Sequence, residues 1–481
     1  MARLEEVALA AWQIDRFGPL LGADRLREAT AIGLASARRL QGRTFWHVNS
    51  TARGGGVAEI LQSLLCYARG FGIDARWLVI EGTAPFFQLT KRLHHALHGA
   101  AGDDSPLGPA QRQTYEQVLA YNARLMLEQV RPGDVVLLHD PQTAGLAPAL
   151  MQHGATVAWR SHVGADHVNA HTELAWSFLA PYLAEVPEIV FSRDAYVPAA
   201  LAGRAVRVAP SIDPFSAKNQ ELDPAAVRSI LVHTGLVDGP AGDGEPAFRA
   251  EGGSLAYVRR PAEVVRSGRT TSWITPLVVQ VSRWDPLKDP IGVMRGFAAQ
   301  LEGSDPIDAD LMLAGPNVTA VTDDPEGATT FVAAVAAWRQ FPDRVRDHIH
   351  LASLPMTDRE ENSAMVNALQ RHATVIIQKS LREGFGLTVT EAMWKARPVI
   401  ASATGGIQDQ IQDGVHGLLL SDPHDLAAYG AAIRCVLRNP ALATGLGERA
   451  RERVRDELLS PRELIQYLEL VARIDPRPEA G

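Results

Sequence analysis

Short apolar segments alternate along the chain with longer segments whose apolar residues recur at helical spacing. The apolar segments have the length of β-strands and are often followed by Gly, Pro or polar residues. We predict strands at 44–49, 76–80, 134–138, 156–160, 188–191, 206–208, 277–282, 310–314, 349–352, 374–377 and 398–401. We predict helices at 57–69, 85–98, 110–130, 359–370, 423–438 and 461–474. This alternation predicts an α/β protein with parallel sheets.

The chain has 481 residues, which is too long for one domain of ordinary size. The strand at 206–208 runs into a proline-rich segment, so we place a domain boundary after Pro214. This gives an N-terminal Rossmann-like domain (1–214) and a C-terminal one (215–460). We expect the last helix, about 461–481, to pack back onto the first domain. Residues 237–272 are rich in Gly, Pro and charge, and we interpret them as an extended excursion or mobile loop.

Composition narrows the class of protein. Apolar residues make up 46% and charged residues 21%, as in soluble globular proteins. No apolar run is long enough to cross a bilayer, and the N-terminus lacks a signal-peptide pattern, so we expect a cytoplasmic protein. The net charge of 47 − 55 = −8 disfavours a nucleic-acid partner. We expect the two cysteines, Cys66 and Cys435, to be buried free thiols.

A glycine-containing turn at 383–386 lies between the strand at 374–377 and a helix. Backbone N–H groups at the start of such a helix are free to bind a phosphate or a sugar hydroxyl. Glu383 and Glu391 flank this turn, eight positions apart. Because eight residues make a little over two helical turns, both carboxylates can face one site.

A second glycine turn, Gly54-Gly55-Gly56, follows the strand at 44–49. Glycines let the backbone approach a ligand closely, so this turn is also a candidate phosphate or sugar cradle. It is not the dinucleotide fingerprint, because the Gly-x-Gly-x-x-Gly pattern is missing. One glycine would suffice for a structural turn, and three in a row favour a functional one.

Two cations, Arg283 and Lys288, lie in the loop that leaves the strand at 277–282. At the carboxyl end of a strand, such a pair can bind a diphosphate, Arg as a fork and Lys as a point charge. The alternative is a pair of surface cations without function.

Polar residues also follow the strands of the first half at the edge where open α/β sheets bind ligands. They are His139, Asp140, Gln142, His162 and Arg193. For each histidine, a functional role and an ordinary hydrogen-bonded structural role are about equally favoured. His94 and His98 have helical i, i+4 spacing but no adjacent acid, so a solvated or substrate-side helix face is favoured over a metal site.

The segment Glu-Gly-Phe-Gly-Leu with its second glutamate resembles the donor site of retaining nucleotide-sugar glycosyltransferases of the GT-B fold, family 4. Five segments, one of which overlaps this motif, are similar to trehalose glycosyltransferring synthases and their phosphorylase relatives. They read HVNSTARGGGVAE (47–59), LHDPQ (138–142), WRSHVG (159–164), VSRWDPLKD (281–289) and QKSLREGFG (378–386). The likeness covers about residues 40–475. It implies two Rossmann-like βαβ domains facing each other across a cleft.

The resemblance implies reversible transfer of glucose from a nucleoside diphosphate glucose to free glucose. The product would be α,α-1,1-trehalose with retention at the anomeric carbon. The base of the nucleotide donor stays open: adenine (ADP-glucose), uracil (UDP-glucose) or guanine. We expect no cofactor and see no metal-ligand set, although Mg²⁺ could assist. The expected partners are the small-molecule substrates, with no nucleic acid and no membrane; a homodimer stays open. We favour front-face attack over a double displacement, for which we can name no carboxylate nucleophile.

The resemblance also implies roles for individual residues. Arg283 and Lys288 would hold the donor diphosphate, and Glu391 would bind the ribose hydroxyls. Glu383 would bind hydroxyls of the donor glucose, and His162 would hydrogen-bond that sugar near the reacting carbon. Further donor-binding residues would be Gly54, Gly55, Gly56, Gly384, Phe385, Gly386 and Leu387. Weaker candidates for binding the acceptor are His139, Asp140, Gln142 and Arg193.

Two alternatives stay open. A trehalose phosphorylase would use the same residues with phosphate and glucose 1-phosphate, although Glu391 favours a nucleotide because it needs a ribose to bind. A non-catalytic sugar or nucleotide sensor is the second alternative. A sensor would have lost catalytic activity. The presence of all four charged residues, Arg283, Lys288, Glu383 and Glu391, argues against such a loss.

Overall fold

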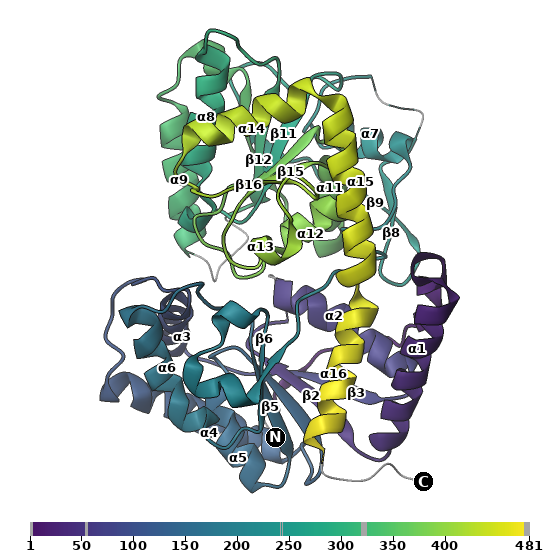
Figure 1. Cartoon of the computed structure of the whole chain (residues 1–481), viewed down its shortest axis with the longest axis vertical. Helices are drawn as coiled ribbons and strands as arrows, with labels where there is room; N and C mark the ends of the chain where they lie inside the picture. Colours follow the sequence, from purple (N-terminus) through teal and green to yellow (C-terminus); the bar gives the residue numbers. More distant parts are fainter. Residues whose placement is uncertain (1–2, 53–55, 241, 243, 319–324, 476–481) are drawn as a thin grey trace. The chain divides into compact units, whose positions relative to one another are not determined.

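The structure is a computed structural model, and it describes residues 3–475 except 53–55, 241, 243 and 319–324. The chain divides into two compact units. Unit 1 comprises Met1–Ser211 together with Glu457–Gly481, and unit 2 comprises Ile212–Asp456. Within the described residues, each unit is built on a seven-stranded sheet with helices packed against it (Figure 1).

The sheet of unit 1 has the strand order β1-β3-β2-β4-β5-β6-β7. Its strands are β1 (Glu5–Glu6), β2 (Thr44–Asn49), β3 (Asp74–Val79), β4 (Val135–His139), β5 (Thr156–Ser161), β6 (Glu188–Phe191) and β7 (Ala205–Arg207). All pairings are parallel except that of β1 with β3. From β2 the chain first adds β3 on one side and then β4 on the other. The carboxyl ends of β2 and β4 therefore form a topological switch point, where α/β sheets bind ligands.

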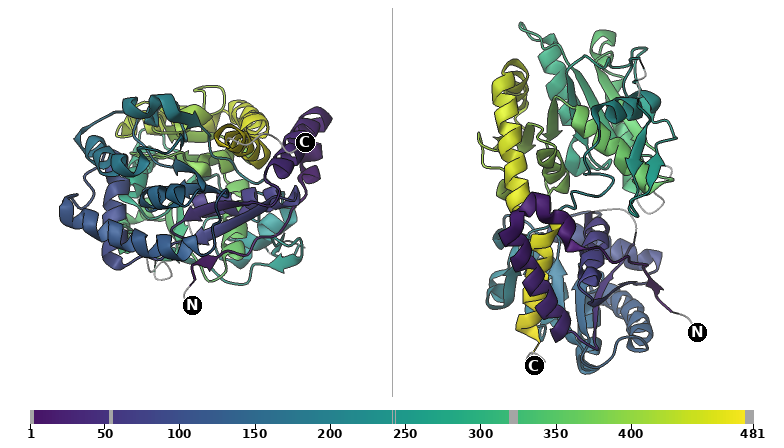
Figure 2. Two further views of the ribbon diagram at one scale, coloured as in Figure 1. Left: turned by 90° about the horizontal axis from the view of Figure 1, so that it is seen from below. Right: turned by 90° about the vertical axis from the view of Figure 1, so that its right-hand side faces the viewer.

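The last helix of the chain belongs to unit 1. The helices of this unit are α1 (Gly18–Arg39), α2 (Gly56–Gly70), α3 (Ala84–Leu97), α4 (Pro109–Leu127), α5 (Ala147–Gln152), α6 (Ala170–Leu183) and α16 (Ser460–Ile474). Figures 1 and 2 show α16 in yellow beside the purple α1, and it also packs on α2. Leu464, Tyr467, Leu468 and Val471 are buried at helical spacing, so α16 buries one apolar face.

The sheet of unit 2 has the order β10-β13-β12-β11-β14-β15-β16. Its strands are β10 (Glu263–Val265), β11 (Leu277–Val281), β12 (Asp310–Pro316), β13 (Ile349–Leu354), β14 (Val375–Gln378), β15 (Val399–Ser402) and β16 (Leu418–Leu420). Only β10 runs antiparallel to its neighbour. Here the switch point lies between β11 and β14.

Nine helices accompany this sheet in the described part of unit 2. They are α7 (Pro224–His233), α8 (Pro290–Glu302), α9 (Pro325–Trp338), α10 (Asp343–Arg346), α11 (Arg359–His372), α12 (Leu387–Trp394), α13 (Ile407–Gln410), α14 (Leu426–Arg438) and α15 (Pro440–Glu457). The strands that they cover are apolar on both faces, as expected for a buried parallel sheet.

Two sequence-based expectations need correction. The excursion at 237–272 contains short strands: β8 (Ala247–Arg249) pairs with β9 (Leu255–Tyr257), and β10 joins the main sheet. Strands of three residues are too short to show a period, so the sequence pattern missed them. Cys66 is buried as expected, but Cys435 is exposed, because it lies on the outer face of α14. Among the described residues, none of the helices has both the length and the apolar character to cross a membrane.

Candidate active site

The loops that follow β11 and β14 flank the switch point of unit 2 and are tied to each other. The Leu381 amide donates to the Leu287 carbonyl at 2.7 Å. The side-chain amide of Gln280, on β11, donates to the Lys288 carbonyl at 2.9 Å. Because β11 and β14 are paired neighbours, their loops leave the sheet side by side. The loop that carries Arg283 and Lys288 and the loop that carries Glu383 are therefore brought together.

Lys288 and Glu383 form an ion pair at this position. Lys288 Nζ lies 2.5 Å from Glu383 Oε2, and the two side chains are only 14% and 12% exposed. The Ser380 hydroxyl donates to the same carboxylate oxygen at 3.2 Å. Ser380 was missed in the sequence analysis, because a serine in a loop carries no distinguishing pattern. The result is a largely desolvated cation held by a carboxylate at a ligand-binding edge.

A second ion pair holds the loop that carries Lys288. The buried Lys379 pairs with Asp289 and donates to the Pro423 carbonyl at 2.6 Å. Asp289 has a left-handed backbone (φ 49°) and caps α8 by accepting from the Gly292 amide at 3.0 Å. A buried charge is tolerated when it is paired and hydrogen-bonded in this way. The backbone next to Lys288 is therefore held in one conformation.

Arg283 lies on the loop after β11, as predicted, but its side chain is directed largely to solvent. It is 60% exposed, and its Nη2 lies 3.5 Å from Asp285 Oδ2. At this exposure a ligand could reach the guanidinium from solvent.

The glycine turn before α12 is held by backbone and side-chain hydrogen bonds. Gly386 is the N-cap of α12 with φ 86°, and a Cβ there would lie 3.0 Å from Ile407 Cγ1. Gln410 Nε2 donates to the Phe385 carbonyl at 2.5 Å, and the Gly406 amide donates to the Gly384 carbonyl at 2.9 Å. With the carbonyls of the turn engaged, the amides from Leu387 onward begin the helix and carry its partial positive charge.

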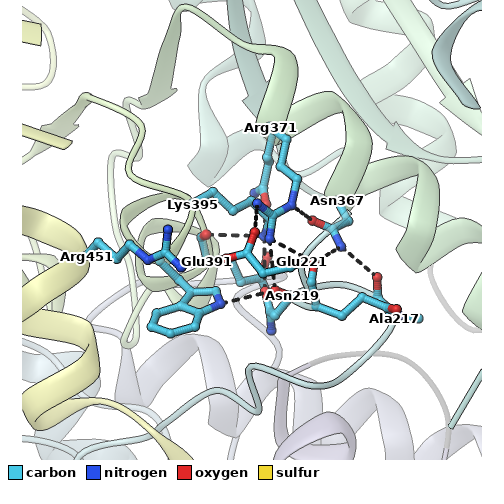
Figure 3. Close-up of polar contacts among 11 residues, drawn as sticks. Ala217, Asn219, Glu221, Asn367, Arg371, Glu391, Lys395 and Arg451 are labelled. Atoms are coloured by element: carbon cyan, nitrogen blue, oxygen red, sulfur yellow. Dashed lines mark hydrogen bonds and ion pairs between the residues drawn. The ribbon is translucent and has the colours of Figure 1, made fainter. Parts of the chain in front are cut away.

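Glu391 lies on α12 with its side chain 3% exposed. Lys218 Nζ lies 3.6 Å from Glu391 Oε1. Lys395, one turn further along α12, donates to the Glu391 carbonyl, to Asn219 Oδ1 and to Gln370 Oε1 at 2.8–3.2 Å (Figure 3). Burial lowers the pKa of Lys395 to about 7, and the negative charge of Glu391 opposes this shift.

The segment that carries Lys218 is anchored on both sides. Asn367 donates to the Ala217 carbonyl at 3.0 Å, and the Trp394 indole donates to the Asn219 carbonyl at 3.1 Å. Glu221 pairs with Arg371 at 2.7 Å and with Arg451 at 2.6 Å (Figure 3). Lys218 is therefore held over Glu391. The sequence analysis missed it, because no local pattern links a lysine in an irregular segment to a helix far along the chain.

In unit 1, His139, Asp140 and His162 come together where β4 and β5 end. His139 Nδ1 lies 3.0 Å from His162 Nε2. Asp140 has φ 63°, and its Oδ1 accepts from the His162 amide at 2.8 Å. Burial lowers the pKa values of both histidines well below the ordinary value, and the positive charge of Arg160 lowers them further. Burial raises the pKa of Asp140 to about 6, although the His162 amide opposes this shift.

The other predicted residues of unit 1 are placed as follows. Arg193 pairs with Asp166 at 2.5 Å and lies over the Tyr196 ring, 5.4 Å from its centroid. Gln142 lies in the loop after β4, three residues past His139, and is partly buried. Gly56 is the first residue of α2, whereas Gly54 and Gly55 lie outside the described residues.

His94, on α3, and His98, the residue after this helix, contact each other. The rings of His94 and His98 meet edge to face with centroids 4.8 Å apart, and His98 Nδ1 lies 3.2 Å from the Gly164 carbonyl. In the described part of the chain, no group of three or more His, Cys, Asp and Glu side chains could hold a metal ion.

Two Rossmann-like units with charged loops at their switch points define a GT-B glycosyltransferase, as the sequence predicted. The family model "Glycosyl transferases group 1" matches residues 352–453. The structure resembles a UDP-forming α,α-trehalose-phosphate synthase from Burkholderia xenovorans, with TM-score 0.66 and 15% identity over 90% of this chain and 100% of that one. It also resembles sucrose-phosphate synthase from Thermosynechococcus elongatus, with TM-score 0.60 and 16% identity over 90% and 99%. At these identities the likeness shows the fold alone.

Sequence similarity identifies the family more closely. The model "Trehalose synthase, N-terminal domain" matches residues 47–198. The chain is 32% identical to the trehalose synthase of Pyrococcus horikoshii over 98% of this chain and 99% of that protein. It is 35% identical to the trehalose synthase of Rubrobacter xylanophilus over 91% and 92%. The chain therefore belongs to the trehalose synthase family, as the resemblance in its motifs predicted. It is also 26% identical to a trehalose phosphorylase of Pleurotus sajor-caju over 85% of this chain and 55% of that protein.

Proposed function

We propose that this protein is a retaining glucosyltransferase that reversibly makes α,α-1,1-trehalose from a nucleoside diphosphate glucose and free glucose. Family membership supports the transfer of a glycosyl group and the link to trehalose. The observation that carries the donor assignment is the desolvated Lys288–Glu383 pair at the switch point of unit 2. A cation at this edge, next to the N-terminus of α12, suits a diphosphate.

The proposed donor contacts follow from the chemistry of each side chain. Lys288 and Arg283 hold the diphosphate, and the amides of the turn from Gly384 to Leu387 add uncharged donors. Glu383 accepts from hydroxyls of the donor glucose. Glu391 accepts from the ribose hydroxyls, with its carboxylate 3.6 Å from Lys218 Nζ.

The transfer step is proposed to occur on one face of the sugar. The bond from the anomeric carbon to the phosphate oxygen breaks, and a bond from that carbon to the anomeric oxygen of the acceptor glucose forms. The acceptor hydroxyl gives its proton to the departing phosphate oxygen, so no protein nucleophile is required. Lys288 stabilises the negative charge that develops on the leaving diphosphate. Trapping of a glucosyl–enzyme adduct would contradict this route and favour double displacement.

A trehalose phosphorylase is the second candidate, because a relative of that name matches this chain. The chain spans only about half of that protein, 55% of its length. The buried Glu391 favours the nucleotide-dependent reaction, because inorganic phosphate offers no ribose hydroxyls for it to bind.

Incubation of trehalose with either a nucleoside diphosphate or phosphate tests the proposal. We expect ADP, UDP or GDP to yield the corresponding nucleoside diphosphate glucose and free glucose, and phosphate to yield no glucose 1-phosphate. Release of glucose 1-phosphate would identify a phosphorylase instead. Binding of sugars and nucleotides, seen as a rise in melting temperature, with no turnover of any kind would identify a sensor.

The role of Arg283 is tested with a matched pair of variants. We expect Arg283→Gln to reduce kcat/KM for the donor by ~10²-fold, because one cationic contact to the diphosphate is lost. Arg344→Gln is the control, because Arg344 is an exposed arginine that pairs with Glu302 on the surface of unit 2. Equal activity of the two variants would contradict the assigned role.

A further inference from the structure

Three histidines of unit 1 form one hydrogen-bonded row. His47 lies in β2, His139 ends β4 and His162 follows β5. His47 Nδ1 lies 3.0 Å from His139 Nε2, and His139 Nδ1 lies 3.0 Å from His162 Nε2. In both pairs the ring planes lie within 25° of parallel and the centroids are 5.2 Å apart. The row thus connects three neighbouring strands of the sheet.

The register of the sheet explains why the row exists. His47 pairs with Leu137, and His139 pairs with Arg160. The next histidine is thus two residues further toward the carboxyl edge on each successive strand. A step of two keeps all three side chains on one face of the sheet. The exposed fraction rises along the row, from 0% at His47 and 1% at His139 to 9% at His162.

All three rings are neutral at ordinary pH. Burial lowers the pKa of His47 to about 3 and lowers the pKa values of His139 and His162 well below 6.5. Arg160, which faces the same row, adds a positive charge that opposes protonation of each ring. A neutral imidazole carries one ring proton, so it donates from one nitrogen and accepts at the other.

Proton counting leaves only two arrangements. Each of the two hydrogen bonds needs one proton, and His139 can supply the proton of only one of them. If His139 donates to His162, then His47 must donate to His139, and His162 carries its proton on Nδ1. If His139 donates to His47, then His162 must donate to His139, and its Nδ1 is bare. The tautomer of His162 is therefore coupled to that of His47.

The buried end of the row selects between these arrangements. His47 Nε2 is buried and, among the described residues, has no hydrogen-bond partner. Buried N–H groups without an acceptor are rarer than buried acceptors without a donor. His47 Nε2 is therefore bare, and each hydrogen bond of the row is donated toward the His162 end.

We infer that His47 and His139 are positioning residues that hold His162 in the tautomer with its proton on Nδ1. His162 then offers a fixed, uncharged N–H donor at the carboxyl edge of the sheet. This inference rests on the proposed function, with His162 hydrogen-bonding the donor sugar as the resemblance implies. A donor that is fixed in advance needs no tautomer change when the sugar binds.

The tautomers can be measured directly on the wild-type full-length chain labelled with ¹⁵N-histidine. Bare and protonated ring nitrogens have well-separated ¹⁵N shifts, and His→Gln variants assign the signals. We expect a protonated Nδ1 on His162 and a bare Nε2 on His47. A protonated His47 Nε2, donating toward the neighbouring Tyr467 ring, would reverse the row and overturn the inference. This readout needs no activity, so it stands even if the proposed reaction fails.

Kinetics test whether the row matters for transfer. We expect His47→Phe to leave His162 in two tautomers and to lower kcat about tenfold with little change in the donor KM. His47→Gln should keep the single His162 tautomer and the wild-type kcat, because its amide can donate to His139 in place of the imidazole. His153→Phe is the control for the loss of a histidine, because His153 lies at the opposite end of β5, near the Val130 carbonyl. An unchanged His162 tautomer or an unchanged kcat in His47→Phe would overturn the positioning role.

Discussion

At the scale of single residues, the candidate donor site depends on charges that are paired before any ligand arrives. The carboxylate of Glu383 accepts from both Lys288 and Ser380, so the ammonium of Lys288 is held in place. A diphosphate would share this ammonium with Glu383. Preorganised charges of this kind stabilise a transition state without the cost of reorganisation.

We predict that Lys288→Met lowers kcat by ~10²- to 10³-fold, because the developing charge on the leaving group loses its cation. The same variant should lose about 2 kcal/mol of stability, because Glu383 is left partly buried without its ion-pair partner. Steady-state kinetics and urea unfolding measure the two effects.

The double variant Lys288→Met/Glu383→Gln separates structure from catalysis. We expect stability to return, because no charge is left unpaired, whereas activity stays low. Recovery of activity together with stability would show that Lys288 has only a structural role.

At the scale of elements, α12 and the turn before it form the main structural unit of the candidate donor site. The turn needs the left-handed conformation of Gly386, and Gln410 from α13 holds its carbonyls. Glu391 projects from the same helix, where Lys218 and Lys395 flank it. One short helix thus positions both the amides that we propose bind phosphate and the carboxylate that we propose binds ribose.

Gly386→Ala should raise the donor KM and lower the free energy of unfolding by about 1–2 kcal/mol. A Cβ in a left-handed conformation is strained, and here it would also press on Ile407. Gly414→Ala is the matched control, because Gly414 has φ 71° but open space around its Cα. It should show the stability loss without the change in KM. An equal KM in both variants would mean that the turn does not bind the donor.

At the scale of the whole molecule, each unit closes its own core around a parallel sheet. In unit 1 the last helix completes this core, and it does so through buried polar contacts as well as apolar ones. Arg160 of β5 pairs with Glu463 of α16 at 2.9 Å, and Ser211 donates to the same carboxylate at 2.6 Å. This pair lies on the face of the sheet that carries the histidine row, so the stability of unit 1 depends on the charge state of that face.

Unit 1 should lose stability as the pH falls from 6.5 toward about 5. Unfolded histidines bind protons in this range, whereas the folded row does not, because its pKa values are lowered. The free energy of unfolding should therefore fall by up to ~1.4 kcal/mol per pH unit for each of the three histidines, and proton uptake by folded Asp140, whose pKa is raised to about 6, offsets part of this fall. Urea titration at each pH, followed by pulsed hydrogen exchange of peptides from β2, β4 and β5, measures this slope.

A variant of the row gives the control for this pH dependence. His139→Phe should reduce the slope by the share of one histidine, even if its stability at pH 7 is lower. A slope that is the same in the wild type and in this variant would show that the row is not the cause.

Local sequence patterns were enough to predict much of the fold and the place of the candidate donor residues. Strand and helix periods are local properties, so β2, β6 and α11 were predicted within about two residues. The same holds for Lys288, Glu383 and the turn at Gly386, because a strand, a loop and a helix in succession place them at the edge of a sheet. The motifs that contain these residues, 281–289 and 378–386, are contiguous in the sequence because each lies in one such succession of elements.

Which distant side chains meet could be seen only once the strands and helices were packed together. Lys218 lies beside Glu391 because an irregular segment is anchored against α11 and α12. His47 joins His139 because β2 and β4 are neighbours in register, which the order of strands along the chain does not specify. A periodic pattern reports how one segment folds and which face it buries. Pairing between segments depends on sheet order and register, and these are settled only when the whole core packs.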